Sequence, residues 1–97
     1  AVCLDSGKIL EAKTTGRTTR FYLRLVAGAD GYILERCDSK DGEFISVAKT
    51  ESNLELTLKD KAPSHFKNYL YRVRSFKIVK EEEFFSEDSD TVTVKTK

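Results

Sequence analysis

Few residues of this sequence are of the types that carry out catalysis or bind metals. The chain has one histidine, His65, and two cysteines, Cys3 and Cys37. No cysteine or carboxylate lies close enough to His65 in the sequence to give the ligand spacing of a zinc site. The sequence also contains no Gly-x-Ser-x-Gly, phosphate-binding loop, dinucleotide fingerprint or His-Glu-x-x-His motif. We therefore expect no enzymatic activity, no metal site and no cofactor.

Charge is nearly balanced over the 97 residues but uneven along them. Seventeen basic and 16 acidic residues give a net charge of +1, which argues against a dedicated nucleic-acid-binding protein. Residues 59–80 contain seven basic residues and one acid, whereas residues 81–90 contain six acids and no base. A bipolar surface of this kind could orient a partner. We favour a structural interpretation, in which charges on neighbouring strands pair across a sheet, as Arg72 and Arg74 would with Glu35.

The elements that must position these residues are short β-strands, because polar and apolar side chains alternate along several segments. Alternation predicts strands at 20–25, 32–35, 54–58, 69–74 and 91–95, with weaker candidates at 9–13 and 44–48. Seven evenly spaced short strands favour a β-sandwich or barrel. The longest connection, 59–68, could hold one helical turn around 63–66. No apolar run reaches the ~18–20 residues that a membrane helix needs.

Two segments carry a resemblance to a known family. Residues 28–36, Gly-Ala-Asp-Gly-Tyr-Ile-Leu-Glu-Arg, resemble the B–C turn and strand C of bacterial-type fibronectin type III domains, and the turn at 41–44 resembles the hairpin that follows. Residues 69–75, Tyr-Leu-Tyr-Arg-Val-Arg-Ser, are similar to strand F of the same family. The resemblance covers residues 18–97.

The resemblance implies one immunoglobulin-like domain over residues 1–97, with residues 1–7 as a linker or the start of strand A. Its fold would be an all-β, seven-strand antiparallel sandwich with sheets ABE and C′CFG. Gly31 would supply a positive φ in the B–C turn, and Tyr69 would form the tyrosine corner. Tyr32, Tyr71 and Val73 would face inward.

The inward positions of the predicted strands define the expected core. It comprises Leu10, Phe21, Leu23, Leu25, Tyr32, Leu34, Val47, Leu54, Leu56, Leu58, Tyr69, Tyr71, Val73, Val92 and Val94. In this topology Cys3 and Cys37 lie at opposite ends of the sandwich, beyond the ~7 Å Cα separation that a disulfide tolerates. Cys37 also has outward parity on strand C, so we expect two thiols and no disulfide.

Four apolar residues are candidates for an interaction surface. Ile33, Leu70 and Phe76 have the outward parity of one sheet and could form an apolar stripe that docks an adjoining domain. Phe84 follows three glutamates and could form a recognition tip. The alternative is that Phe85 packs at the start of strand G, with Phe84 partly exposed.

Arginines and an aromatic residue could together suggest a nucleic-acid platform. These residues are Arg20, Tyr22 and Arg24 on predicted strand B, and Arg72 and Arg74 on predicted strand F. Because strands B and F lie in opposite sheets, we expect no single patch and no nucleic-acid partner.

The expected function is that of a non-catalytic spacer and protein-interaction module. The resemblance implies a larger multidomain protein at the cell surface or outside the cell, with adjoining domains as partners, no membrane insertion and a monomeric state in isolation. The alternative is an independent ligand-binding domain for a protein or a glycan, with Tyr22 and Phe84 as the candidate aromatic platforms. Residues 85–89, Phe-Ser-Glu-Asp-Ser, are also similar to a motif of cytokine-type receptor modules, although Asp88 replaces the second aromatic residue.

Overall fold

A computed structural model of the chain describes residues 7–38, 42–52, 54–86 and 91–97. These residues form eight β-strands, and none of them belongs to a helix that could span a membrane. The strands are β1 (Ile9–Thr15), β2 (Thr18–Leu23), β3 (Gly31–Cys37), β4 (Ile45–Lys49), β5 (Thr57–Lys61), β6 (Asn68–Val79), β7 (Glu82–Phe85) and β8 (Val92–Lys95).

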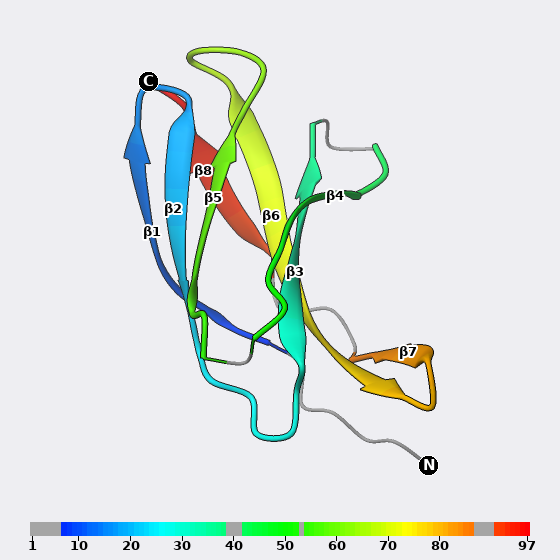
Figure 1. Cartoon of the computed structure of the whole chain (residues 1–97). Coiled ribbons are helices and arrows are strands. Elements are labelled where there is room, and N and C mark those ends of the chain that lie inside the picture. Colours follow the sequence, from blue (N-terminus) through cyan, green and yellow to red (C-terminus); the bar gives the residue numbers. More distant parts are fainter. Residues whose placement is uncertain (1–6, 39–41, 53, 87–90) are drawn as a thin grey trace.

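The strands form two antiparallel sheets that pack face to face (Figure 1). One sheet has the order β1-β2-β5, and the other has the order β4-β3-β6, with β7 and β8 both paired to β6. β8 pairs with Asn68–Tyr71 and β7 pairs with Phe76–Val79, so the two segments share the strand-G edge of β6. The predicted all-β sandwich with sheets ABE and C′CFG is confirmed.

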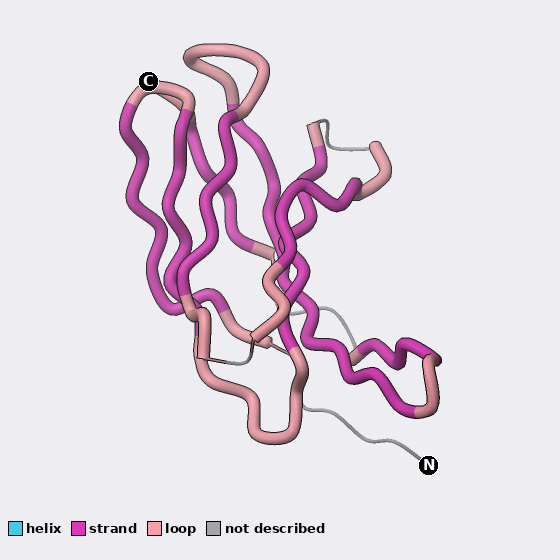
Figure 2. Tube along the Cα trace, viewed as in Figure 1, coloured by secondary structure: helices cyan, strands magenta, loops and turns pink. Residues whose placement is uncertain are grey.

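Alternating side chains from both sheets fill the space between them. Most of the expected core is buried: Phe21, Leu23, Tyr32, Leu34, Leu58, Tyr69, Tyr71, Val73 and Val94. Val47, Leu56 and Val92 are partly buried and pack against this cluster. Inward and outward residues thus alternate along the strands, as the sequence pattern predicted. The loops gather at the two ends of the sandwich (Figure 2).

Leu10 was expected in the core, but its side chain is 59% exposed. The pairing of β1 with β2 shifts between Ile9 and Glu11. A β-bulge of this kind adds one residue to a strand and changes which side chains face inward. Ile9 and Ala12 pack against the core in place of Leu10.

Two further core predictions, Leu25 and Leu54, are wrong because the strands end earlier or begin later than the alternation suggests. β2 ends at Leu23, so Leu25 is half-exposed and Val26 is buried instead, with its N–H donating to the Tyr32 hydroxyl at 2.9 Å. β5 begins at Thr57, which leaves Leu54 in the preceding connection and exposed. The helical turn expected at 63–66 is also absent, because these described residues form only bends.

Gly31 is required for a different reason than the sequence suggested. The positive φ in the B–C turn belongs to Gly28, at 82°, and Gly31 does not have one. Gly31 lies on β3 opposite Phe76, and a Cβ added to it would overlap the Thr50 carbonyl oxygen and come within 2.8 Å of the Phe76 ring. The backbone therefore approaches its neighbours too closely for any side chain.

Candidate interaction site

The tyrosine expected at the corner of the sandwich makes the hydrogen bond that the resemblance implied. Tyr69 is buried on β6, and its hydroxyl accepts the Ser64 N–H at 3.0 Å, five residues upstream. This bond fixes the connection between β5 and β6 against the end of the core. Tyr32, Tyr71 and Val73 also face inward and are fully buried.

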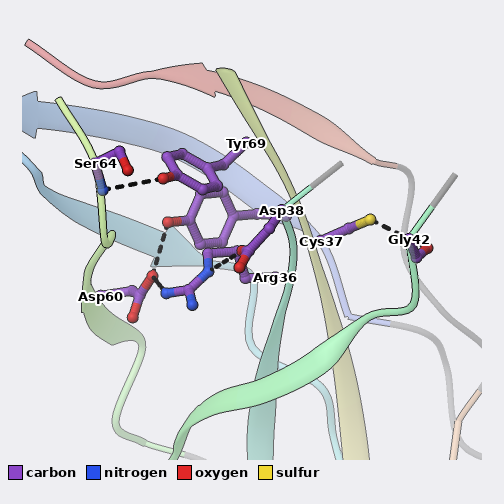
Figure 3. A network of polar contacts seen from close by, with 8 residues as sticks. Arg36, Cys37, Asp38, Gly42, Asp60, Ser64 and Tyr69 are labelled. Carbon is purple, nitrogen blue, oxygen red and sulfur yellow. Dashed lines mark hydrogen bonds and ion pairs between the residues drawn. The ribbon is translucent and has the colours of Figure 1, made fainter. Parts of the chain in front are cut away.

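Beside Tyr69 lies a buried polar network that sequence analysis missed (Figure 3). Arg36 on β3 donates from Nη1 to Oδ2 of Asp60 on β5 at 2.9 Å, and the Tyr71 hydroxyl donates to the same oxygen at 2.7 Å. Arg36 also donates from Nε to Oδ1 of Asp38 at 2.6 Å. Because β3 and β5 belong to different sheets, the Arg36–Asp60 ion pair links the two layers of the sandwich.

The electrostatics of the network favour one protonation state. Burial by itself would lower the pKa of Arg36, but its hydrogen bonds and ion pairs with Asp60 and Asp38 outweigh burial and raise the pKa above its ordinary value. Burial raises the pKa of Tyr71, and donation to Asp60 raises it further. A permanent cation, a carboxylate that accepts two hydrogen bonds and a neutral phenol form a structural cross-link rather than a reactive group.

The raised pKa of Tyr71 predicts a specific loss of stability in alkali. Because the folded state holds the phenolic proton more tightly than the unfolded state, the associated stabilisation is complete below the unfolded pKa of ~10 and is lost as the pH rises through the folded pKa. Above pH ~10, Tyr71 should lower the free energy of unfolding by up to about 1.4 kcal/mol per pH unit. Urea unfolding of the wild type and of Tyr71→Phe between pH 8 and pH 12 measures how much Tyr71 contributes to the fall in the free energy of unfolding with pH. Equal slopes for the two proteins would contradict the assignment.

The outer face of the sheet β4-β3-β6 does not present the continuous apolar stripe expected from Ile33, Leu70 and Phe76. Ile33 and Leu70 are half-buried, and their register positions on the sheet are separated by charged residues. Arg72 donates from Nε to Glu35 at 2.8 Å, and Arg74 lies 3.5 Å from the same carboxylate. The predicted cross-strand pairing of these charges is therefore present, and it interrupts the stripe.

Phe76 has the predicted outward parity but is 1% exposed, which corrects its place in the candidate surface. The Lys49 ammonium lies 4.7 Å from the centroid of its ring, and the Phe85 ring lies at 6.5 Å. Cys37 is likewise buried despite its outward parity, and its thiol donates to the carbonyl of Gly42 in the following turn at 3.2 Å. Cys3 lies outside the described residues, so the expectation of two thiols stays a prediction.

The remaining candidate, Phe84, belongs to a two-stranded ribbon that projects from the sandwich (Figure 1). We call residues 76–85 the β6–β7 ribbon. Phe84 is half-buried, whereas Ile78 and Phe85 are 50% and 49% exposed, so Phe85 does not pack away as the alternative reading expected. The ribbon reverses at Lys80 and Glu81, and both residues have positive φ. This turn geometry matches the twist of the two flanking strands. Positive φ is unfavourable for lysine and glutamate, because their Cβ atoms crowd the backbone.

A groove of about 500 Å³ runs along the base of the ribbon. It is lined by Asp30, Lys49, Glu51, Phe76 and Ile78. Asp30 accepts the backbone N–H of Ile78 at 2.6 Å, and Lys49 lies 3.3 Å from Glu83. The half-exposed side chain of Ile78 thus stands beside a polar rim, and an apolar centre with a polar rim is the composition of many protein interfaces.

Comparisons with known proteins identify the fold and no family. No protein-family model and no curated protein matches the sequence. Among solved structures, a β-1,2-glucanase from Parabacteroides distasonis is similar over 97% of this chain, with a TM-score of 0.78 and 21% identity, and this chain spans only 13% of the glucanase chain. An Fn3-like protein from Clostridium thermocellum matches 95% of this chain and 92% of its own, with a TM-score of 0.72 and 18% identity.

A third similar structure, the twitchin kinase region from C. elegans, matches 97% of this chain and 16% of its own, with a TM-score of 0.69 and 14% identity. The fold is therefore that of a fibronectin type III-like β-sandwich. Such domains occur both as the greater part of a chain and as a small part of a longer one. At these identities the likeness concerns the fold alone.

Proposed function

We propose that this chain is a non-catalytic spacer and protein-interaction module of a larger multidomain protein. The β6–β7 ribbon carries the proposal, because it holds Ile78 and Phe85 half-exposed beyond the edge of the sandwich. An aromatic and an aliphatic side chain next to a polar rim form a suitable anchor for a neighbouring domain. The similar folds within the longer glucanase and twitchin chains support a modular role.

A location outside the cell or at its surface rests on the resemblance of the B–C turn and strand F to bacterial-type domains.

Calorimetry of the parent polypeptide tests this proposal. If the ribbon docks a neighbouring domain, the double variant Ile78→Ser/Phe85→Ser should lower the unfolding temperature of that neighbour or separate two transitions that coincide in the wild type. Leu54→Ser, at an apolar residue that is 76% exposed elsewhere on the surface, is the matched control and should change neither. If the neighbour's transition is unchanged in the ribbon variant, the ribbon does not dock and the proposal fails.

A further inference from the structure

The outer face of the sheet β1-β2-β5 is strongly basic. Its outward side chains include Lys13 on β1, Arg20 on β2, and Lys59 and Lys61 on β5, with Glu11 as the one acid among the outward residues of these three strands. Lys13, Arg20 and Lys59 lie directly opposite one another in the strand register. Three cations therefore form one row across the sheet, with neighbouring strands about 4.8 Å apart.

This row is unfavourable for the folded protein by itself. Like charges directly opposite one another on neighbouring strands repel, and a sheet that served only as a surface would gain from alternating signs. Lys13 lies 3.9 Å from Glu11, and both side chains are largely exposed. Within the described part of the chain, Arg20 and Lys59 have no ion pair. The outer face of the other sheet differs, because Glu35 there forms ion pairs with both Arg72 and Arg74.

The same face has the shape and groups of a carbohydrate surface. A shallow groove of about 460 Å³ is lined by Lys13, Thr15, Thr18, Arg20, Tyr22 and Lys59. Tyr22 is half-buried, and the Lys13 ammonium lies 5.8 Å from its ring centroid. A phenol ring can stack on a sugar ring, threonine hydroxyls can bond sugar hydroxyls, and the cations can bind acidic groups. The groove offers no apolar pocket that would hold the side chains of an acidic peptide.

We propose that the outer face of β1-β2-β5 binds an acidic polysaccharide, a chain of sugars that bear carboxylates or sulfates. Arg20 and the two lysines of the row would contact the acidic groups, while Tyr22 and the threonines would contact the sugar rings. Binding would relieve the repulsion within the row. This face lies on the opposite sheet from the β6–β7 ribbon, so the proposal goes beyond the docking role and does not depend on it.

Titration of the 97-residue chain at low salt, followed by calorimetry and amide NMR shifts, tests the proposal. The acidic probes are polygalacturonate and dextran sulfate, and fully methyl-esterified polygalacturonate is the uncharged match to the first. We expect binding of at least one acidic polysaccharide, shifts at Lys13, Arg20, Tyr22 and Lys59, and weakening as ionic strength rises. Poly-L-glutamate and single-stranded DNA, which carry charge without acidic sugars of this kind, should bind at least tenfold more weakly.

Variants assign the binding to this face. Neutralising Lys13, Arg20 or Lys59 to glutamine should weaken binding by up to about fivefold each, and the triple variant should lose at least tenfold. Lys95→Gln, at an exposed lysine on β8, is the charge-matched control and should bind as the wild type does. Because the row repels itself, the triple variant should unfold at the same or a higher temperature, which separates lost binding from lost folding.

Several results would overturn the proposal. These are no binding of either acidic polysaccharide, equal or tighter binding of poly-L-glutamate or DNA, equal binding of the esterified probe, or full binding by the triple variant.

Discussion

Replacing Asp60 by alanine is expected to lower the free energy of unfolding by about 3–5 kcal/mol, because the change leaves the buried Arg36 without its main partner. Arg36 and Asp60 have side chains only 9% exposed, and the Tyr71 hydroxyl also donates to Asp60. Removing the carboxylate therefore leaves one cation and one phenol poorly satisfied within the sandwich. Chemical denaturation with tyrosine fluorescence measures the loss.

Two further variants show whether the effect comes from the unpaired charge. Glu83→Ala breaks the exposed pair with Lys49 and should cost no more than about 1 kcal/mol. Combining Asp60→Leu with Arg36→Met replaces both charges by apolar groups and should restore most of the stability lost in Asp60→Ala. A loss below about 1 kcal/mol in Asp60→Ala would mean that the network does not hold the two sheets together.

Gly31→Ala is expected to destabilise the fold by about 3 kcal/mol, because overpacking of a well-packed site commonly costs 1–3 kcal/mol and backbone is one of the obstructing groups here. The added methyl group would overlap the Thr50 carbonyl oxygen and press on the Phe76 ring. Thr50 cannot easily retreat, because its N–H donates to the Tyr32 carbonyl at 2.9 Å and its hydroxyl accepts the Tyr32 N–H at 3.1 Å.

Gly16→Ala is the matched control for this prediction. Gly16 has a φ of 60°, and an added Cβ there would meet no heavy atom within 4 Å. Its substitution should cost only the backbone strain of a left-handed alanine, about 1 kcal/mol. Equal losses for the two variants in thermal or urea unfolding would show that Gly31 serves the chain through backbone freedom and not through close packing.

Alternation in the sequence was sufficient to predict the strands whose inward residues are mostly apolar. The central strands β3 and β6 follow this pattern over residues 32–34 and 69–73, and the pairing of Glu35 with Arg72 followed from their positions on these strands. The errors arise where local geometry changes the parity or the strand ends. The bulge at Leu10 depends on how β1 pairs with β2, which no pattern within residues 9–15 reveals.

The buried network was missed because charged residues were taken to face outward. A signal was nevertheless present, since Arg36 follows Leu34 and Asp60 follows Leu58 at the same inward parity. Two inward residues of opposite charge on strands of different sheets predict a pair across the sandwich. Phe76 and Cys37 show the converse limit, because outward parity does not ensure exposure where a loop or a long side chain covers the position.

The uneven charge along the sequence acquires a different meaning in the structure. The basic stretch at 59–80 crosses from β5 to β6, which belong to different sheets. Its first lysines join Lys13 and Arg20 on one outer face, whereas its arginines pair with Glu35 on the other. The glutamates at 81–83 lie on the ribbon. They are therefore next to neither the lysines of β5 nor the arginines that pair with Glu35. The charges therefore define two separate surfaces rather than one dipole.

Hydrogen exchange in the parent polypeptide tests the proposed module most directly. The amides of residues 77–85 are compared between the isolated 97-residue chain and the same residues within the parent protein. The proposed docking predicts that exchange in the ribbon slows by at least tenfold in the parent, and that Ile78→Ser/Phe85→Ser abolishes this difference. Equal exchange of the ribbon in the two contexts would contradict a role in domain docking.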